Sequence, residues 1–389
     1  MRLLRVVLAS CLITVAGVTL VVGETCRRGD VTTKFRRSLY DLACKLYKQV
    51  ASQTDDHFAV SQYSIWLALA GMAEGASGDV RAEILATLKI PDPICLRLEY
   101  YELATELESS AEDVRLERTR SLLVDGDLKV NETWMRDVRE VGLLDTVFTP
   151  QDKLRELLQV NDSSSHSIQA VLSDSLDYSG LWTSSFTSIT PNVSFYDDYG
   201  NKIGTVDMMT TKSRVKLAYI PILNAKVLEL PVGNNGRYRM LLLTNLGKKS
   251  IRDTIDVFQS TLIVDIFDRL LQSIIPLEIS IPIFSMTSDL RLRSALENLE
   301  IRKMWKENKG WSPNPVEFFQ RVSLDIKSEG LSPAPGSSSS ILTSVEGAAT
   351  GLATAVGREF TANRPFMFAL LDATTRTCLF SGAFSKPTH

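Results

Sequence analysis

The sequence predicts an α+β protein, because helix-like and strand-like segments occur mostly in separate blocks of the chain rather than in regular alternation. Apolar residues recur at helical spacing from Phe35 to Val50 and again from Tyr63 onward, which indicates a helical first part. Beyond Ala225, compact apolar runs bounded by turn residues indicate strands. The length of 389 residues alone is compatible with one large domain or two.

The individual elements are expected in the following order. An amphipathic helix over residues 35–50 precedes a short strand, HFAVS, a buried helix that ends at the turn GASG, and a second helix that Asp79 opens. The runs AKVLELPV and YRMLLLTNL are strands, and Gly233 to Gly236 between them is a hairpin signal. LEISIPIFSM is a half-buried strand, DLRLRSALENLEI is helical, and FMFALLDATTRTCLFSGAF contains two strands around a turn. No fixed-period repeat occurs, which argues against a solenoid or a propeller.

The N-terminus has the pattern of a secretory signal peptide over residues 1–23. Two arginines precede an apolar run from Val6 to Val22, which ends in small residues at Gly23. The alternative is a membrane anchor, for which the run is short. We therefore expect a secreted, extracellular protein of residues 24–389. Secretion would make Asn131, Asn161 and Asn192, each in an Asn-x-Ser/Thr triplet, candidate N-glycosylation sites.

The cysteines do not identify a disulfide framework or a zinc site. Cys26, Cys44, Cys95 and Cys378 remain after the leader, and their wide spacing fits neither pattern. One or two bridges are compatible with the sequence. Cys44 and Cys378 lie in apolar surroundings and could instead be buried free thiols.

The residues needed for most catalytic or binding chemistry are missing. His57, His166 and His389 have no partner at metal-ligand or acid-base spacing, and no Gly-x-Ser-x-Gly motif occurs. The glycine clusters lack a phosphate-binding lysine, and the basic residues are too dispersed for a nucleic-acid surface. The net charge of -3 favours neither nucleic acid nor an anionic membrane as a partner. We expect no enzyme activity, no metal, no cofactor and a monomeric protein.

Several motifs in order along the chain resemble the serpin family of serine protease inhibitors. FAVSQYSIWLALAGMAEGASGDVRAEIL resembles the family's strand, Ser-Pro-x-Ser-Ile and helix, with Gln62 in place of the proline and with Ser61 and Ser64 as the two serines beneath the main sheet. GLW, VDMM, VLELP and MLLL follow, and FTANRPFMFALLDATTRTCLFSGAFSKP is similar to the family's C-terminal motif. The resemblance covers almost the whole mature chain.

The resemblance implies a serpin fold, which is one domain of three β-sheets and about nine helices. It also implies an exposed reactive loop, here over residues 331–359, that is offered as bait to an extracellular serine protease. In the family, the cleaved loop enters the main sheet as a new central strand and carries the trapped acyl-enzyme with it.

Two registers of this loop fit the sequence. In the first, VEFFQRVSLDI is the strand before the loop, and the hinge consists of Gly330, Leu331, Pro333 and Pro335. In the second, the small-residue hinge is Gly347, Ala348 and Ala349, and GSSSSILTSVEG stands where a buried strand should be. Apolar patterning favours the first register.

Several positions depart from the family pattern in ways that would impair loop insertion. Pro333 and Pro335 cannot donate to a central β-ladder. Asp174 and Gln320 stand where the family has an asparagine and a histidine in the sheet-opening region that also contains Ser61 and Ser64. A buried Asp174 would need a hydrogen-bond partner or a raised pKa. The segment QDKLRELLQVNDSSSHS is also shorter than the helix and connector that usually cover the main sheet.

The scissile bond is not fixed by the sequence. The family's usual distance from Gly330 reaches Ser344 and Val345, beside Leu342, whereas Arg358 is a trypsin-like alternative. Two hypotheses follow. In the first, the loop is exposed but the trap is impaired, and the protein is a protease substrate, decoy or binding protein. In the second, it is a true inhibitor of a secreted serine protease.

Overall fold

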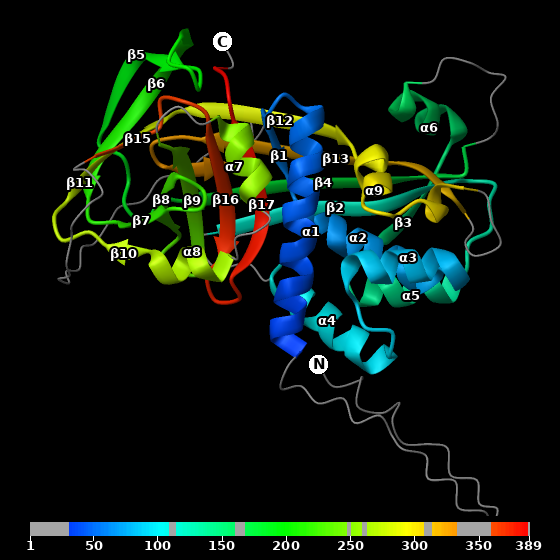
Figure 1. Ribbon diagram of the computed structural model, residues 1–389. Helices are drawn as coiled ribbons and strands as arrows, with labels where there is room; N and C mark the ends of the chain where they lie inside the picture. Colours follow the sequence, from blue (N-terminus) through cyan, green and yellow to red (C-terminus); the bar gives the residue numbers. More distant parts are fainter. Residues whose placement is uncertain are drawn as a thin grey trace, which may run out of the picture.

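The computed structural model describes residues 31–108, 114–159, 168–246, 250–258, 263–306, 313–332 and 359–387. Within these ranges the chain forms nine α-helices and three β-sheets (Figure 1), so the expected α+β architecture in one domain is confirmed. The expected signal peptide, Cys26, Asn161, His166 and His389 lie outside the described residues. None of the helices in the described ranges is long and apolar enough to cross a membrane.

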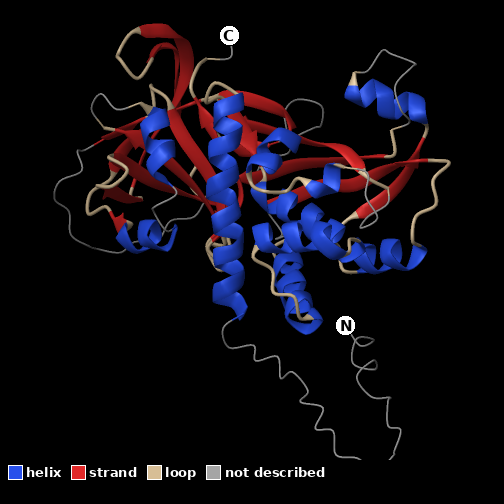
Figure 2. Ribbon diagram, turned by 45° about the vertical axis from the view of Figure 1, so that its right-hand side comes forward, coloured by secondary structure: helices blue, strands red, loops and turns tan. Residues whose placement is uncertain are grey.

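Several helices lie below the sheets, whereas α1 runs across them and α6 lies apart at one end (Figures 1 and 2). The helices in the described residues are α1 (Val31–Gln53), α2 (Gln62–Gly75), α3 (Gly78–Leu88), α4 (Ile94–Glu106), α5 (Glu132–Glu140), α6 (Gln151–Leu158), α7 (Ile251–Phe258), α8 (Ile263–Arg269) and α9 (Arg293–Asn298). α2 is buried along most of its length, and Ser61 is its N-cap because the Ser61 hydroxyl accepts a hydrogen bond from the backbone N–H of Ser64 over 3.2 Å. α1 carries one buried stripe, as its sequence predicts.

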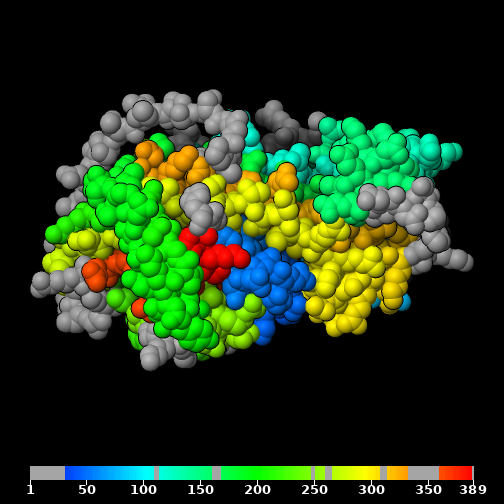
Figure 3. Space-filling view, turned by 90° about the horizontal axis from the view of Figure 1, so that it is seen from above, coloured from blue at the N-terminus to red at the C-terminus, as the bar shows by residue number. Residues whose placement is uncertain are grey.

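The largest sheet has seven strands. In order across the sheet these are β1 (Phe58–Val60), β17 (Thr377–Phe384), β16 (Phe366–Asp372), β9 (Tyr238–Asn245), β8 (Ala225–Val232), β7 (Lys216–Ile220) and β10 (Leu271–Gln272). β8 and β9 form the expected hairpin, in which Val232 pairs with Tyr238. Gly233 and Gly236 in the connection have φ angles of +72° and +70°, which glycine adopts without strain. Seen from above, the end of α1 (blue) lies beside the C-terminal segment that follows β17 (red) (Figure 3).

The second sheet has four strands and lies at one end of the molecule (Figure 1). Its order is β15 (Glu359–Thr361), β11 (Leu277–Pro282), β6 (Lys202–Ser213) and β5 (Ser188–Tyr196). β11 contains the predicted alternation, with Leu277, Ile279 and Ile281 buried.

The third sheet has six strands, and we call it the main sheet. Its order is β12 (Phe284–Arg291), β13 (Pro315–Ile326), β14 (Gly330–Ser332), β4 (Ala170–Leu181), β2 (Val114–Asp125) and β3 (Asp145–Thr149). α2 packs against β2 and β4 of this sheet and against β17 of the seven-stranded sheet, so it joins the two. The short helix α6 lies at the far end of the main sheet rather than over its centre (Figure 1).

Candidate functional site

The main sheet is forked, and β14 lies in the fork. β14 pairs antiparallel with both of its neighbours. In this register Leu331 lies opposite Ile326 of β13 on one side and opposite Gly180 of β4 on the other. Away from the fork, β13 and β4 pair directly with each other. This pairing extends from Phe318 opposite Leu172 to Ser323 opposite Asp177. Within the described residues, β14 separates β13 from β4 over Gly330 to Ser332, and the two strands pair directly with each other farther along the sheet.

Glycine is required where the chain enters the fork. A Cβ atom on Gly330 would lie 2.2 Å from the carbonyl oxygen of Gly180 and 2.6 Å from the Cα of Leu181, and no side chain can approach a backbone so closely. Trp182 secures the turn that precedes β14, because its backbone N–H donates to Glu329 O over 2.9 Å and its indole N–H donates to Lys327 O over 2.8 Å. The sequence motif GLW thus contributes to the wall of the fork.

Gln320 joins β13 to β4 and to α2 in the closed part of the sheet. Its Nε2 donates to Asp174 Oδ2 over 2.6 Å and to the carbonyl oxygen of Ser61 over 2.9 Å. Its Oε1 accepts from the backbone N–H of Ser61 over 2.9 Å. Strands β13 and β4 therefore cannot separate at this level without breaking a buried hydrogen bond.

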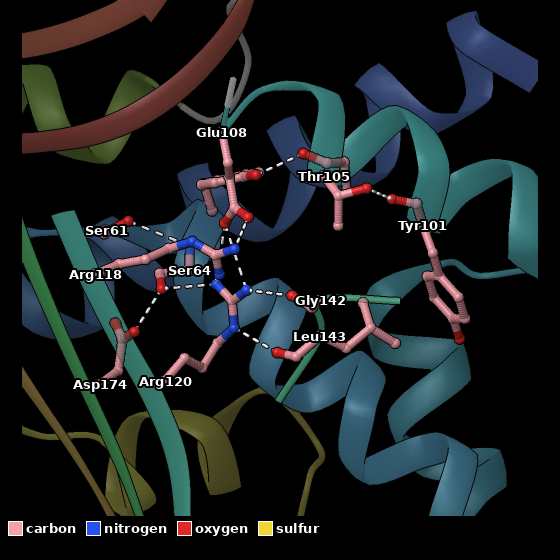
Figure 4. A network of polar contacts seen from close by, with 12 residues as sticks. Ser61, Ser64, Tyr101, Thr105, Glu108, Arg118, Arg120, Gly142, Leu143 and Asp174 are labelled. Carbon is pink, nitrogen blue, oxygen red and sulfur yellow. Dashed lines mark hydrogen bonds and ion pairs between the residues drawn. The ribbon is translucent and has the colours of Figure 1, made fainter. Parts of the chain in front are cut away.

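Behind Asp174 lies a buried polar network that extends to β2 (Figure 4). Ser64 Oγ donates to Asp174 Oδ1 over 2.5 Å and accepts from Arg120 Nη1 over 3.2 Å. Arg120 also donates to the carbonyl oxygen of Gly142 over 2.8 Å and to that of Leu143. The network holds Asp174 through Oδ1, whereas Gln320 contacts Oδ2.

The network contains two arginines and two acidic residues, of which Arg120 and Asp174 have almost no access to water. Asp174 is 2% exposed and Arg120 is 3% exposed. Burial raises the pKa of Asp174, and the charge of Arg120 lowers it in part. Burial lowers the pKa of Arg120, and burial together with Arg120 lowers the pKa of Arg118 to about 10. Glu108 pairs with both guanidinium groups, at 3.4 Å from Arg120.

The four residues expected in the sheet-opening region lie together in this cluster. Ser61, Ser64, Asp174 and Gln320 are all buried, and Asp174 has both hydrogen-bond partners and a raised pKa. Arg118, Arg120 and Glu108 were not predicted from the sequence. A signal was present, because the inward positions of β2 are otherwise apolar and the two arginines interrupt that pattern.

The remaining expected residues are placed only in part. Of the hinge residues, Gly330 and Leu331 lie in β14, and Leu331 is buried. The other loop residues lie outside the described ranges, namely Pro333, Pro335, Leu342, Ser344, Val345, Gly347, Ala348, Ala349 and Arg358. VEFFQRVSLDI, the strand expected before the loop in the first register, forms most of β13.

Other sequence candidates are on or near the surface. Asn131 and Asn192 are exposed, and Asn131 is also the N-cap of α5. Cys95 is disulfide-bonded, whereas Cys44 and Cys378 are free. In the described part of the chain, no three His, Cys, Asp or Glu side chains are grouped to hold a metal ion.

A second candidate site is a cavity between two helices and the seven-stranded sheet, which we call the α1–β17 cavity. Residues of α1, α2, β16 and β17 line most of it, including Arg36, Gln62 and Thr377. Each of these three side chains has a buried polar atom without a hydrogen-bond partner, namely Arg36 Nε, Gln62 Oε1 and Thr377 Oγ1. Buried polar groups are normally paired, so these atoms mark the cavity as a candidate binding site.

Comparison with known proteins identifies the family. The family model for Serpin (serine protease inhibitor) matches residues 37–145 and 149–387. An uncharacterized serpin-like protein of Methanosarcina mazei is 22% identical over 94% of this chain and 89% of its own length. Rabbit (Oryctolagus cuniculus) corticosteroid-binding globulin is 26% identical over 92% of this chain and 98% of its own. A solved complex of thyroxine-binding globulin with thyroxine has a TM-score of 0.75 at 19% identity and covers 92% of this chain and 100% of its own.

Proposed function

Because the chain belongs to the serpin family, we propose that it is a secreted protein that presents the segment between β14 and β15 to an extracellular serine protease, and that insertion of this segment stops close to β14. The protein would then be a protease substrate, decoy or binding protein rather than an efficient trap. It acts without enzyme activity of its own.

The two prolines that follow β14 in the sequence carry this proposal. After Gly330–Ser332 of β14 the sequence continues with Pro333 and Pro335. Further insertion would make both prolines part of a central strand, where each lacks the N–H that the ladder needs. Alternate residues of a strand direct their N–H groups to the same neighbour, so both losses would fall on one interface.

Three further observations support the proposal. The hydrogen bond between Gln320 and Asp174 holds β13 and β4 together in the path of insertion. For secretion, the support is the disulfide bond at Cys95, since disulfides persist in oxidising compartments. The exposed positions of Asn131 and Asn192 are compatible with glycosylation.

The test is the melting temperature before and after a single protease cut between residues 333 and 358. We expect little change in the natural protein, because the cut segment does not enter the sheet. A double variant, Pro333→Ala with Pro335→Ala, restores both N–H donors and should show a rise in melting temperature after the same cut. Incubation with the cutting protease should yield cleaved protein without an SDS-stable complex.

The alternative is a functional inhibitor whose hinge is at Gly347 or whose scissile bond lies near Leu342 to Val345. It requires a large rise in melting temperature after cleavage of the natural protein, together with an SDS-stable complex. Either result would overturn the impaired-insertion proposal.

We propose a second function, the binding of a small molecule in the α1–β17 cavity. The three unpartnered polar atoms of Arg36, Gln62 and Thr377 favour it. This chain is similar to corticosteroid-binding globulin and thyroxine-binding globulin, and both of these proteins are named after the small molecules that they bind. The neutral fluorescent probe N-phenyl-1-naphthylamine should bind to the full-length protein, and Ala43→Phe, which fills the cavity from α1, should abolish that binding.

A further inference from the structure

We propose that Asn235, in the connection between β8 and β9, is a site of spontaneous deamidation, and that the folded protein accumulates isoaspartate there with age. Asn235 is the only asparagine in the sequence that precedes a glycine. This covalent modification is independent of the functions proposed above. Three features of the connection favour it, namely the hydrogen bond of the Asn235 side chain, the accessible nitrogen of Gly236 and the exposure of both residues to water.

The reaction joins two groups of neighbouring residues, so it is intramolecular. The backbone nitrogen of Gly236 loses its proton and attacks Cγ of Asn235, which forms a new C–N bond and a succinimide ring. The C–N bond of the side-chain amide breaks, and its nitrogen leaves with a proton as ammonia. Water then opens the ring at either of its two carbonyl groups and gives aspartate or isoaspartate. No oxidant or reductant takes part.

The side chain of Asn235 is held close to the peptide group that attacks it. Asn235 Oδ1 accepts a hydrogen bond from the backbone N–H of Arg237 over 2.9 Å. This Asx turn closes a ring that contains both Asn235 Cγ and Gly236 N, so the electrophile and the nucleophile stay near each other. The same N–H stabilises the negative charge that develops on Oδ1 as the nitrogen attacks.

Gly236 supplies a nitrogen that is easily reached. It has no Cβ atom to shield this nitrogen, and its φ angle of +70° is one that other residues adopt only with strain. Among the described residues, no backbone carbonyl group accepts a hydrogen bond from the Gly236 N–H, so loss of its proton breaks no such contact. Asn235 is exposed and Gly236 is half-buried, which gives water access to the amide and to the succinimide.

The two products differ in their effect on the fold. Aspartate keeps an oxygen in the position of Oδ1, so the hydrogen bond from the N–H of Arg237 is retained. Isoaspartate routes the backbone through the former side chain and lengthens the connection by one methylene group. Val232 and Tyr238 are paired at the two ends of the connection, so the added length displaces the residues between them, including Arg237.

Arg237 joins this connection to two other parts of the molecule. Its Nε donates to Asp372 Oδ2 over 2.5 Å, and its Nη2 donates to the carbonyl oxygen of Glu106, at the end of α4, over 3.2 Å. Asp372 is fully buried, and its Oδ1 accepts from the backbone N–H groups of Thr374 and Thr375 in the turn before β17. Displacement of Arg237 removes a cation from a buried carboxylate, so isoaspartate should destabilise the protein.

The experiment follows deamidation of the full-length natural protein at pH 7.4 and 37 °C by peptide mapping and mass spectrometry. Water enriched in heavy oxygen marks the new carboxylate, and an isoaspartate-specific methyltransferase measures isoaspartate. We expect Asn235 to react at least about tenfold faster than Asn234, because the residue after Asn234 carries a Cβ atom. The rate at Asn235 should rise about tenfold for each unit of pH, since base removes the proton from the attacking nitrogen.

Two variants at position 235 separate the reaction from its consequences. Asn235→Ser keeps an acceptor for the N–H of Arg237 but has no amide to react, so its melting temperature should stay constant during incubation. Asn235→Asp reproduces the aspartate product and, when freshly prepared, should melt with the fresh natural protein. The natural protein should lose several degrees of melting temperature, in proportion to its content of isoaspartate.

The same chain unfolded in guanidinium chloride is the reference for the role of the structure. We expect Asn235 to react no more slowly in the folded protein than in the unfolded chain. A rate at least about tenfold lower in the folded protein would overturn the proposal, because the connection would then protect Asn235. Equal rates at Asn234 and Asn235 would overturn it as well. Accumulation of isoaspartate at a constant melting temperature would overturn the predicted displacement of Arg237.

Discussion

Gln320 on β13 donates a hydrogen bond over 2.6 Å to Asp174 on β4, and the same nitrogen donates over 2.9 Å to the carbonyl oxygen of Ser61 at the start of α2. One side-chain amide thus joins the two strands that loop insertion must separate and anchors them to the helix beneath. Asp174 is fixed in turn by Ser64, which Arg120 contacts. The closed sheet is stabilised by a continuous buried network and not by β-ladder hydrogen bonds alone.

Replacement of Gln320 by leucine should destabilise the closed sheet. Gln320→Leu leaves Asp174 Oδ2 and both backbone groups of Ser61 without the amide that pairs with them. Loss of a buried partner costs about 1–3 kcal/mol for each group left unpaired, so the free energy of unfolding should fall by at least that amount. Chemical denaturation followed by circular dichroism measures this change.

The matched control is Arg321→Ala on the same strand. Arg321 is exposed and pairs with Asp289 at 2.6 Å on the outer face of the sheet, so its removal should change the free energy of unfolding by less than about 1 kcal/mol. Similar effects of the two substitutions would contradict a specific role for the amide. Gln320→Leu should also accelerate uptake of an added loop peptide by the sheet, whereas Arg321→Ala should not.

Replacement of Asp174 by asparagine should change the pH dependence of stability. Burial raises the pKa of Asp174 in the folded protein above the ordinary value of 3.8. The folded state therefore binds the proton more tightly than the unfolded chain, and stability from this group is present at low pH and is lost as pH rises through the folded-state pKa. Each unit by which the pKa is raised corresponds to about 1.4 kcal/mol.

The measurement is the difference in the free energy of unfolding between Asp174→Asn and the natural protein, taken at intervals from pH 7 to pH 4. The variant has no proton to bind at this site, so it should be the more stable protein at pH 7, and its advantage should shrink as pH falls. A difference that is constant with pH would mean that Asp174 does not titrate in this range. A variant that is less stable at pH 7 would mean that the charge of Asp174 is needed to balance Arg120.

Replacement of Gly330 by alanine should expel β14 from the fork. The added Cβ would lie 2.2 Å from Gly180 O and 2.6 Å from the Cα of Leu181, which are backbone atoms of β4 and cannot move aside as a flexible side chain can. Gly126→Ala is the control, because a Cβ there meets nothing within 4 Å. We expect faster amide hydrogen exchange at Leu331 and Gly180 in Gly330→Ala and no change in Gly126→Ala. Unaltered exchange in both variants would contradict the tight fit at the fork.

The sequence predicted the elements of the fold better than the details of the site. The period of apolar residues identified α1, β11 and the hairpin of β8 and β9, because each of these elements exposes one face or ends at a glycine turn. The resemblance in the sequence placed Ser61, Ser64, Asp174 and Gln320 in one region. Arg120 and Glu108 were not found, since Glu108 follows α4 and reaches Arg120 through tertiary packing that no local pattern encodes.

The α1–β17 cavity could not be predicted from the sequence, for a related reason. Gln62 was identified only as a replacement for a proline, and its role follows from the position of Ser381, more than three hundred residues later in the chain. An unpaired atom such as Gln62 Oε1 is recognised only when every neighbour is in place. Cavities and unpaired polar atoms are properties of the packed structure, whereas the apolar period belongs to the sequence.

Replacement of His57 by asparagine should remove a loss of stability in mild acid. Burial, with a smaller contribution from Lys386, lowers the pKa of His57 to about 4. The unfolded chain binds this proton near pH 6.5, so stability from neutral His57 is lost as pH falls from about 6.5 to about 4. Asparagine retains an acceptor for the backbone N–H of Ser385, which in the natural protein donates to His57 Nδ1 over 3.3 Å.

The stability difference between His57→Asn and the natural protein should therefore increase in favour of the variant as pH falls from about 6.5 to about 4. The advantage of Asp174→Asn, in contrast, should shrink as pH falls. Parallel trends for the two variants would contradict at least one of these assignments.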